Sequence, residues 1–214
     1  MIDAVVFDLD GVLLDTEQVW DGVREQLAHE RGGRWHDRAQ RDMMGMSSPE
    51  WSRYMHDVVG LSESPEEISA EVVRRLMAVY RERLPALPGA REAVERLAAR
   101  WALGLASSSN RELIDLALDL LGVAGLFEAT VSSEEVARGK PAPDVYLEAA
   151  RRLGVEPTHV AAIEDSHNGI LSAKAAGMRV LGIPNSHFPP DDDAVPDVVL
   201  SSLTELTPEA IEPG

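Results

Sequence analysis

Two pairs of carboxylates have the residue types and the spacing needed for metal or acid–base chemistry. Asp8 and Asp10 follow a short apolar run at residues 4–7, and Glu164 and Asp165 follow a second apolar run. Side chains alternate along a strand, so Asp8 and Asp10 point to the same side. Neighbouring carboxylates repel each other unless a cation lies between them or one carries a proton. These pairs indicate either a site for a divalent cation or acidic turns whose side chains cap backbone amides.

Two other polar segments lie between the carboxylate pairs. The first follows an apolar run and consists of Ser107, Ser108, Ser109 and Asn110. Hydroxyl groups and free backbone amides at the start of a helix bind anions, although serine and asparagine are also ordinary N-caps. The second segment contains Lys140, one of only two lysines, directly before a proline. A lysine held there either neutralises an anion or faces solvent.

The elements that position these residues follow from six short apolar runs alternating with helical patterns. The runs cover residues 4–7, 102–106, 129–131, 160–163, 180–183 and 198–200. Continuous rather than alternating hydrophobicity is typical of strands buried on both faces. Strands that alternate with helices predict right-handed βαβ units around a parallel sheet. The predicted fold class is therefore α/β, with all four polar segments at strand ends or in nearby loops.

Residues 16–84 interrupt this alternation. They contain several helical patterns and no convincing strand, and they lie directly after the first predicted strand. Pro85 and Pro88-Gly89 mark the return to the sheet. The sequence predicts two domains: an α/β core formed by residues 1–15 and 85–214, and an inserted all-helical domain formed by residues 16–84.

Composition limits the classes of function. The chain has 214 residues, 37 acidic and 20 basic side chains and a formal net charge of −17, which argues against nucleic acid as a partner. It has no cysteine, which excludes disulfides, thiolate nucleophiles and sulfur-ligated metals. No basic leader precedes an apolar stretch, and no apolar stretch approaches the ~20 residues of a membrane span. We expect a cytoplasmic monomer that binds a small molecule and no membrane.

The order of the four segments, carboxylate pair, serines, lysine and carboxylate pair, closely resembles the haloacid dehalogenase-like superfamily over nearly the whole chain. The position of the insertion resembles the subgroup with a helical cap, which includes β-phosphoglucomutase and many sugar-phosphate phosphatases. This resemblance implies a Rossmann-like core, a helical cap over the active site and Mg²⁺ as cofactor.

The resemblance also implies roles for individual residues. Asp8 would be the nucleophile that forms an aspartyl-phosphate, and Asp10 the general acid and base. Ser107 and Lys140 would hold the phosphoryl oxygens. Magnesium would be bound by Asp8, the backbone carbonyl of Asp10 and Asp165, with Glu164 acting directly or through water. The expected substrate-binding residues are the hinge Thr16, the cap-loop residues Gly45, Met46 and Ser47, and Ser108, Asn110 and Arg111 after the second motif.

The reactions of this superfamily require different residues, and the sequence can be checked for each of them. Dehalogenases lack the second aspartate of the first motif, which is present here as Asp10. Phosphonate hydrolases need a cap lysine to form a Schiff base, and residues 16–84 contain none. We therefore expect a magnesium-dependent phosphatase that hydrolyses a small phosphate monoester such as a sugar phosphate.

Two alternatives remain open. The first is a phosphosugar mutase; Ser48 and Trp20 stand where β-phosphoglucomutase has an arginine and a histidine, so Arg41 or Arg111 would have to supply the second cation. The second is a non-catalytic phosphate-binding protein on the same scaffold. Such a protein would normally have lost at least one of the four motifs, and all four are present.

Overall fold

A parallel sheet of six strands organises the chain, which confirms the predicted α/β class. The computed structural model describes residues 1–43, 46–183 and 194–212. The strand order is β3-β2-β1-β4-β5-β6, and every neighbouring pair is parallel. The strands are β1 (Ala4–Phe7), β2 (Ala102–Ser107), β3 (Ala129–Ser132), β4 (Val160–Glu164), β5 (Arg179–Gly182) and β6 (Val198–Val199). Each of them agrees with a predicted run to within one residue at either end.

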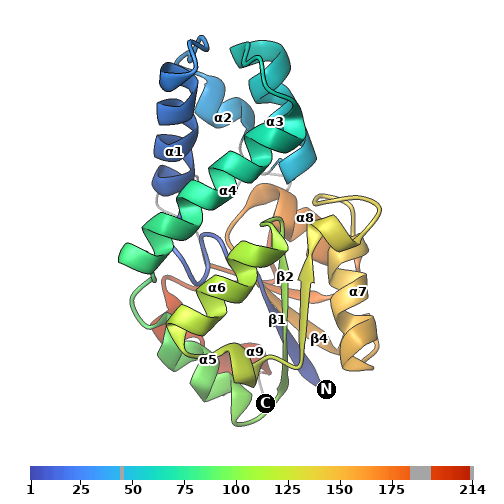
Figure 1. Ribbon diagram of the computed structural model, residues 1–214. Helices are drawn as coiled ribbons and strands as arrows, with labels where there is room; N and C mark the ends of the chain where they lie inside the picture. The colour runs from blue at the N-terminus through green and yellow to red at the C-terminus, as the bar shows by residue number, and fades with distance from the viewer. Residues whose placement is uncertain (44–45, 184–193, 213–214) are drawn as a thin grey trace.

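Helices cover both faces of the sheet (Figure 1). On one face lie α5 (Ala90–Ala98), α6 (Arg111–Leu121) and α9 (Pro208–Ile211), and on the other lie α7 (Asp144–Leu153) and α8 (His167–Ala175). Alternate residues of β1 enter the two layers: Val5 and Phe7 pack with the first group of helices, whereas Ala4 and Val6 pack with the second. Burial on both faces explains why the strands are continuously apolar.

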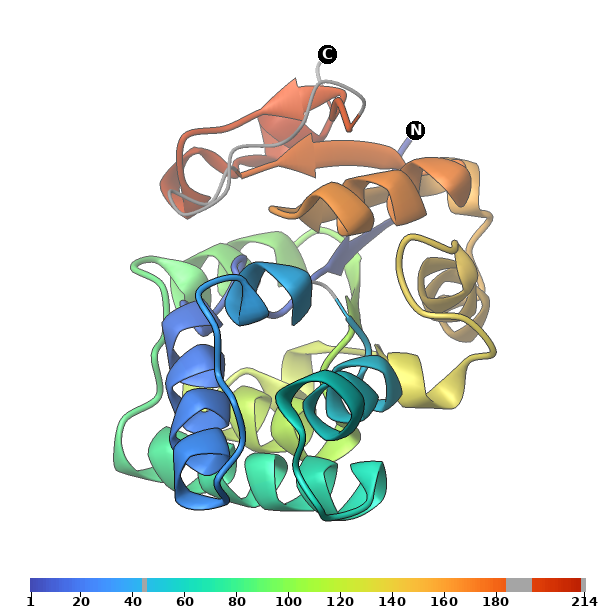
Figure 2. The same cartoon turned by 90° about the horizontal axis from the view of Figure 1, so that it is seen from above.

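The described residues between 16 and 84 are mainly helical and stand at one end of the sheet (Figures 1 and 2). The α-helices of this insertion are α1 (Glu17–Glu30), α2 (Ala39–Met43), α3 (Ser48–Tyr54) and α4 (Pro65–Glu82), with one π-helical turn at Met55–Val59. The described residues 16–43 and 46–84 contain no strand. The all-helical character of the insertion is therefore as expected, while the domain boundaries at residues 15/16 and 84/85 stay a prediction.

The helix α4 shows how the sequence specifies this segment. The side chain of Ser64 accepts a hydrogen bond from the backbone N–H of Glu67 at 3.3 Å, and Glu67 accepts one from the backbone N–H of Ser64 at 2.9 Å. This reciprocal cap begins the helix. The buried face then repeats every four residues through Ile68, Val72, Leu76 and Tyr80. α4 packs against both α1 and α6, so it joins the insertion to the sheet.

The two connections between the insertion and the sheet run side by side. Leu14 forms an antiparallel bridge with Ala86. The backbone N–H of Asp15 donates to the carbonyl of Pro85 at 2.8 Å, and that of Leu87 donates to the carbonyl of Leu13 at 2.9 Å. The insertion thus leaves and re-enters the sheet at one place. Within the described part of the chain, no helix has the length and apolar character needed to cross a membrane.

Candidate active site

Lys140 joins one carboxylate from each of the two pairs, Asp8 and Glu164, at the carboxyl edge of the sheet. Asp8 follows β1, and its backbone N–H donates to the carbonyl of Ile163 in β4 at 3.0 Å. The ammonium of Lys140 lies 2.9 Å from Asp8 Oδ1 and 2.5 Å from Glu164 Oε1. All three of these charged side chains are buried. Charged groups so far from water require close partners of opposite sign, and here each has one.

The carboxylate of Glu164 is held by partners on both of its oxygens. Tyr146 donates its hydroxyl to Oε1 at 2.7 Å, beside Lys140. Oε2 accepts from the backbone N–H of Asp165 at 3.0 Å and from the hydroxyl of Ser166 at 3.1 Å. Gly169 of α8 lies against the same carboxylate, since a Cβ at that position would fall 1.9 Å from Oε1. Glu164 is therefore fixed by its surroundings.

Three acidic residues form a cluster that could hold a metal ion. Asp8, Glu164 and Asp165 each offer one oxygen, and these oxygens all lie within 4.8 Å of one another. Three buried carboxylates and the single ammonium of Lys140 leave a formal charge of −2. An oxygen-only donor set with this charge fits a hard divalent cation such as Mg²⁺. Gly11 permits the arrangement, because its φ is +82° and a Cβ there would lie 1.9 Å from Asp165 Oδ2.

The carboxylate of Asp10 lies outside this cluster and is oriented by two hydroxyl groups. Thr16 donates to Asp10 Oδ1 at 2.6 Å, and Ser109 donates to Oδ2 at 2.6 Å. Ser109 is not among the residues that we singled out for the site. Its only sequence signal is its place in the serine run, and which of the three serines reaches Asp10 depends on how the chain turns after β2.

Burial acts on the pKa values of Asp8 and Lys140. Burial raises the pKa of Asp8 to about 7; Lys140 opposes this shift, whereas the charges of Glu164 and Asp10 add to it. A divalent cation in contact with Asp8 would favour the ionised carboxylate and lower that pKa. For Lys140, burial alone would lower the pKa, but Asp8 and Glu164 outweigh it and raise the pKa above its usual range. The lysine therefore remains charged at neutral pH.

A cavity of about 660 Å³ opens over these groups. Its floor includes Asp8, Asp10, Lys140 and Asp165. The opposite side, called here the helical wall, is formed by residues on or next to α1, α2 and α3: Glu17, Trp20, Asp21, Arg24, Gln40, Arg41, Met43, Met46 and Trp51. The cavity therefore lies between strand ends that carry the acidic cluster and the inserted helices.

Arg24 is the most enclosed charge of the helical wall. Its guanidinium carbon lies 4.7 Å from the ring centre of Trp20 and 4.9 Å from that of Trp51. One nitrogen, Nη1, is 3.8 Å from Asp21 Oδ1, and Nε is buried with no hydrogen-bond partner among the residues described. Burial lowers the pKa of Arg24 to about 10, so the guanidinium stays charged at neutral pH.

Glu17 is the second unsatisfied group of the helical wall. Its Oε2 is buried and accepts no hydrogen bond from the part of the chain that is described. Burial first, and then the charges of Asp21, Asp15 and Asp10, raise the pKa of Glu17 to about 7. Neither Glu17 nor Arg24 was predicted as a site residue. On the sequence they read as ordinary charged positions of an amphipathic helix.

The predicted substrate-binding residues are divided between the cavity and its surroundings. Thr16, Met46 and Ser108 line the cavity, as does Arg41. Gly45 lies outside the described residues. Ser107 is buried at the end of β2, where its hydroxyl oxygen accepts from the backbone N–H of Ser109 at 3.0 Å.

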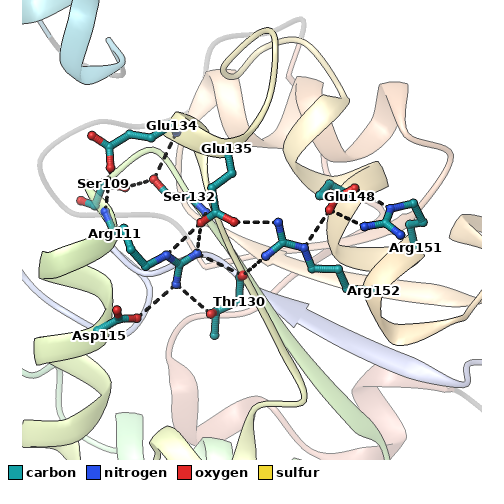
Figure 3. A network of polar contacts seen from close by, with 10 residues as sticks. All are labelled: Ser109, Arg111, Asp115, Thr130, Ser132, Glu134, Glu135, Glu148, Arg151 and Arg152. Atoms are coloured by element: carbon teal, nitrogen blue, oxygen red, sulfur yellow. Dashed lines mark hydrogen bonds and ion pairs between the residues drawn. The ribbon is translucent and has the colours of Figure 1, made fainter.

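Ser47, Asn110 and Arg111 do not line the cavity. Ser47 caps α3 together with Glu50, and Asn110 contacts Ser48 and Glu134 at 2.7 Å each. Arg111 is held by Asp115, Thr130 and Glu135 in a surface network that continues to Glu148, Arg151 and Arg152 (Figure 3). In this arrangement Arg111 is a structural cation, and the structure gives no support to its predicted contact with substrate.

Known proteins resemble the chain over most of its length. The model of the haloacid dehalogenase-like hydrolase family matches residues 2–177. Hexitol phosphatase B of Escherichia coli (strain K12) is 35% identical, over 95% of this chain and 94% of its own. A phosphorylated carbohydrates phosphatase of Thermotoga maritima is 34% identical, over 86% of this chain and 87% of its own. The crystal structure of CbbY from Rhodobacter sphaeroides in complex with phosphate superimposes with a TM-score of 0.89 at 26% identity, covering 99% of both chains.

Proposed function

Because the chain belongs to the haloacid dehalogenase-like hydrolase family, we propose that it is a magnesium-dependent phosphatase acting on a small phosphate monoester such as a sugar phosphate. The observation that carries this proposal is the buried group of Asp8, Lys140 and Asp165 at the floor of a cavity, with Glu164 directly behind them. Relatives named as phosphatases of hexitols and of phosphorylated carbohydrates support the substrate class.

In this proposal the carboxylates of Asp8 and Asp165 and the backbone carbonyl of Asp10 would hold the metal, with Glu164 acting directly or through water. When bound, Mg²⁺ offsets the repulsion between an anionic nucleophile and an anionic phosphate. Lys140 supplies a second positive charge, since its ammonium is already 2.9 Å from Asp8 Oδ1. Lys140 and Ser108, which line the cavity, hold the phosphoryl oxygens; Ser107 is predicted for the same role from the sequence, but it is fully buried and does not line the cavity.

The reaction has two steps. The carboxylate of Asp8 attacks phosphorus, the ester P–O bond breaks, and the leaving oxygen takes a proton from the carboxyl group of Asp10. The resulting carboxylate of Asp10 then accepts a proton from the water that attacks the aspartyl-phosphate, which releases inorganic phosphate and restores Asp8. Thr16 and Ser109 keep the carboxyl group of Asp10 beside the cavity in both steps. Residues 16–84 serve as a cap that excludes bulk water.

Replacement of the nucleophile tests the mechanism. Asp8→Asn removes the attacking anion while keeping the shape, so we expect kcat for 4-nitrophenyl phosphate to fall by about four orders of magnitude or more, because uncatalysed monoester hydrolysis is extremely slow. Chelation should abolish the activity of the unaltered enzyme, and Mg²⁺ should restore it. Asp119→Asn, at an exposed position of α6, is the matched control and should retain full activity. Turnover by Asp8→Asn near the wild-type rate, or full activity after exhaustive chelation, would refute the proposal.

The products separate a phosphatase from a mutase. A mutase must grip a second phosphate, and Arg111 is engaged in the surface network, whereas Arg41 lines the cavity. With sugar phosphates as substrates we expect release of free phosphate. Isomerised sugar phosphate without release of phosphate would instead identify a mutase, and a protein that turns over no ester at all would be a binding protein.

A further inference from the structure

The loop at residues 107–110, called here the serine loop, is held from β3, the neighbouring strand at the edge of the sheet. The hydroxyl of Ser132, the last residue of β3, donates to the backbone carbonyl of Ser109 at 2.7 Å. The hydroxyl of Ser133 donates to the backbone carbonyl of Ser108 at 3.0 Å. Ser132 and Ser109 are both buried, so bulk water does not compete for the bond between them. The backbone of Ser109 therefore lies where the end of β3 places it.

Glu134, the next residue of the chain, continues this contact. Its carboxylate accepts from the side-chain amide of Asn110 at 2.7 Å and from the backbone N–H of Arg111 at 2.9 Å (Figure 3). Residues 132–134 thus hold residues 108–111, from the serine loop to the first residue of α6. Hydrogen bonds from a supporting segment keep functional side chains in their working geometry.

Ser132 is itself anchored on two sides. Its Oγ accepts from the backbone N–H of Glu134 at 3.2 Å, and its backbone N–H donates to Glu135 Oε1 at 3.2 Å. Glu135 is in turn bound by Arg111 and by Arg152, whose Nη2 lies 2.6 Å from Glu135 Oε2 (Figure 3). A hydroxyl group has a single hydrogen, and the contacts of Ser132 direct that hydrogen to the serine loop.

Ser109 transmits this placement to Asp10. Its hydroxyl donates to Asp10 Oδ2 at 2.6 Å, while Thr16 donates to the other oxygen. A serine hydroxyl can also accept, so the contact persists when Asp10 carries the proton that it gives to the leaving oxygen. Hydrogen bonds weaken steeply as their angle departs from the optimum, so a shift of the Ser109 backbone would loosen the hold on Asp10. Ser132 does not line the cavity, and its effect on Asp10 passes through Ser109.

We propose that Ser132 is a positioning residue for the proton transfer by Asp10, and that it acts through Ser109. This inference rests on the proposed phosphatase function and adds to it a residue of β3 that lies outside the four polar segments of the sequence.

Two esters that differ in their need for a proton test this role. 4-Nitrophenolate is a stable anion that leaves without a proton, whereas the sugar alkoxide of glucose 6-phosphate requires one from Asp10. Ser132→Ala removes the donor to Ser109, so the ratio of kcat/KM for glucose 6-phosphate to kcat/KM for 4-nitrophenyl phosphate should fall about tenfold. Ser133→Ala is the matched control, because it makes the same change at the next residue and leaves Ser109 bonded; the ratio should stay unaltered.

A double variant tests whether Ser132 acts through Ser109. Ser109→Ala should lower the ratio about tenfold by itself, since it removes the hydroxyl that holds Asp10. Addition of Ser132→Ala to Ser109→Ala should then lower the ratio no further, because the contact that Ser132 supports is already gone. A hundredfold fall in the double variant would show that the two serines act independently and would overturn the proposal.

A second substitution covers loss of folding in the first. If Ser132→Ala does not fold, Ser132→Cys keeps a side chain of similar size and replaces the hydroxyl with a weak donor, and the same fall in the ratio is expected. Circular dichroism identifies the folded variants.

The failure of this proposal differs from the failure of the proposed function. An unchanged ratio in the Ser132 variant, with both esters still hydrolysed or both slowed equally, would overturn the positioning role alone. An unaltered enzyme that hydrolyses no phosphate ester in the presence of Mg²⁺ would overturn the function and the positioning role together.

Discussion

Tyr146 lies outside the four polar segments of the sequence, yet it contacts the centre of the candidate site. Its buried hydroxyl donates to Glu164 Oε1 at 2.7 Å and lies 3.5 Å from the ammonium of Lys140. Glu164 therefore shares one oxygen between a tyrosine and a lysine, while backbone amides hold the other. Partners of this kind orient the groups that bind a metal, so Tyr146 is a positioning residue for Glu164.

Removal of one hydroxyl group tests that role. Tyr146→Phe keeps the ring and deletes the hydrogen bond to Glu164, so the Mg²⁺ concentration required for half-maximal activity should rise about tenfold. A Mg²⁺ titration of kcat/KM measures this shift. Tyr54→Phe is the control, because Tyr54 bonds to Asp42 at 2.7 Å on α2 rather than to the acidic cluster. A magnesium requirement equal in the two variants would remove Tyr146 from the metal site.

Among single residues, the sequence predicts the charged side chains that could bind a metal or a phosphate. Asp8, Lys140, Glu164 and Asp165 lie together as their order along the chain indicates. The sequence cannot reveal Tyr146, because its importance depends on which residue its hydroxyl reaches across the space between α7 and β4. The same holds for the pair of Glu17 and Arg24, whose missing partners are a property of burial in the folded chain.

At the scale of elements, α8 and β4 approach each other so closely that a glycine is required between them. Gly169 lies in the first turns of α8, and a Cβ there would meet Glu164 Oε1 at 1.9 Å. Gly22 in α1 is the contrasting case, because a Cβ at that position would have no heavy atom within 4 Å. Glycine normally weakens a helix relative to alanine, so the two positions should respond in opposite ways.

Alanine substitution at both glycines tests this contact. Gly169→Ala must displace the carboxylate of Glu164, so we expect a loss of about 1–3 kcal/mol in the free energy of unfolding and a weaker response to Mg²⁺. Gly22→Ala should gain about 0.5–1 kcal/mol, or roughly 2 °C in the melting temperature. Thermal unfolding followed by circular dichroism measures both. Equal stabilisation by the two substitutions would show that Gly169 has room for a side chain.

The elements of the sheet could be predicted almost to the residue, while the residues with which the insertion lines the site could not. Strands buried on both faces leave a continuous apolar signal that ends where the polar edge begins, as at Phe7 and Ile163. The insertion shows the helical period in α1 and α4, but the period does not say which turn of α1 meets the cavity. That depends on the packing of α1 against α4 and of α4 against α6, which join residues far apart in the chain.

At the scale of the whole molecule, a net charge of −17 surrounds a site proposed for an anionic substrate. Long-range repulsion should slow the encounter, and only the local charge of Lys140 and the metal would overcome it. Salt screens exposed charges more than buried ones, since the Debye length falls from about 30 Å at 0.01 M to about 8 Å at 0.15 M.

Added salt should therefore raise kcat/KM for an anionic substrate. At constant Mg²⁺, raising the KCl concentration over that range should increase kcat/KM for glucose 6-phosphate by a factor of about two or more, with kcat nearly constant. Initial rates at several salt concentrations measure the effect. A steady fall in kcat/KM would show that attraction by the buried ammonium, rather than the net charge, governs binding.

The bridge between Leu14 and Ala86 has a consequence for how the protein can evolve. Since the insertion departs from the sheet and returns to it at one place, its ends stay together whatever lies between them. A segment attached in this way can be lengthened, shortened or exchanged without moving a strand of the sheet. Asp8 and Lys140 belong to the sheet side of this junction, whereas Glu17 and Arg24 belong to the inserted helices. Evolution can thus change what the protein recognises independently of the reaction it performs.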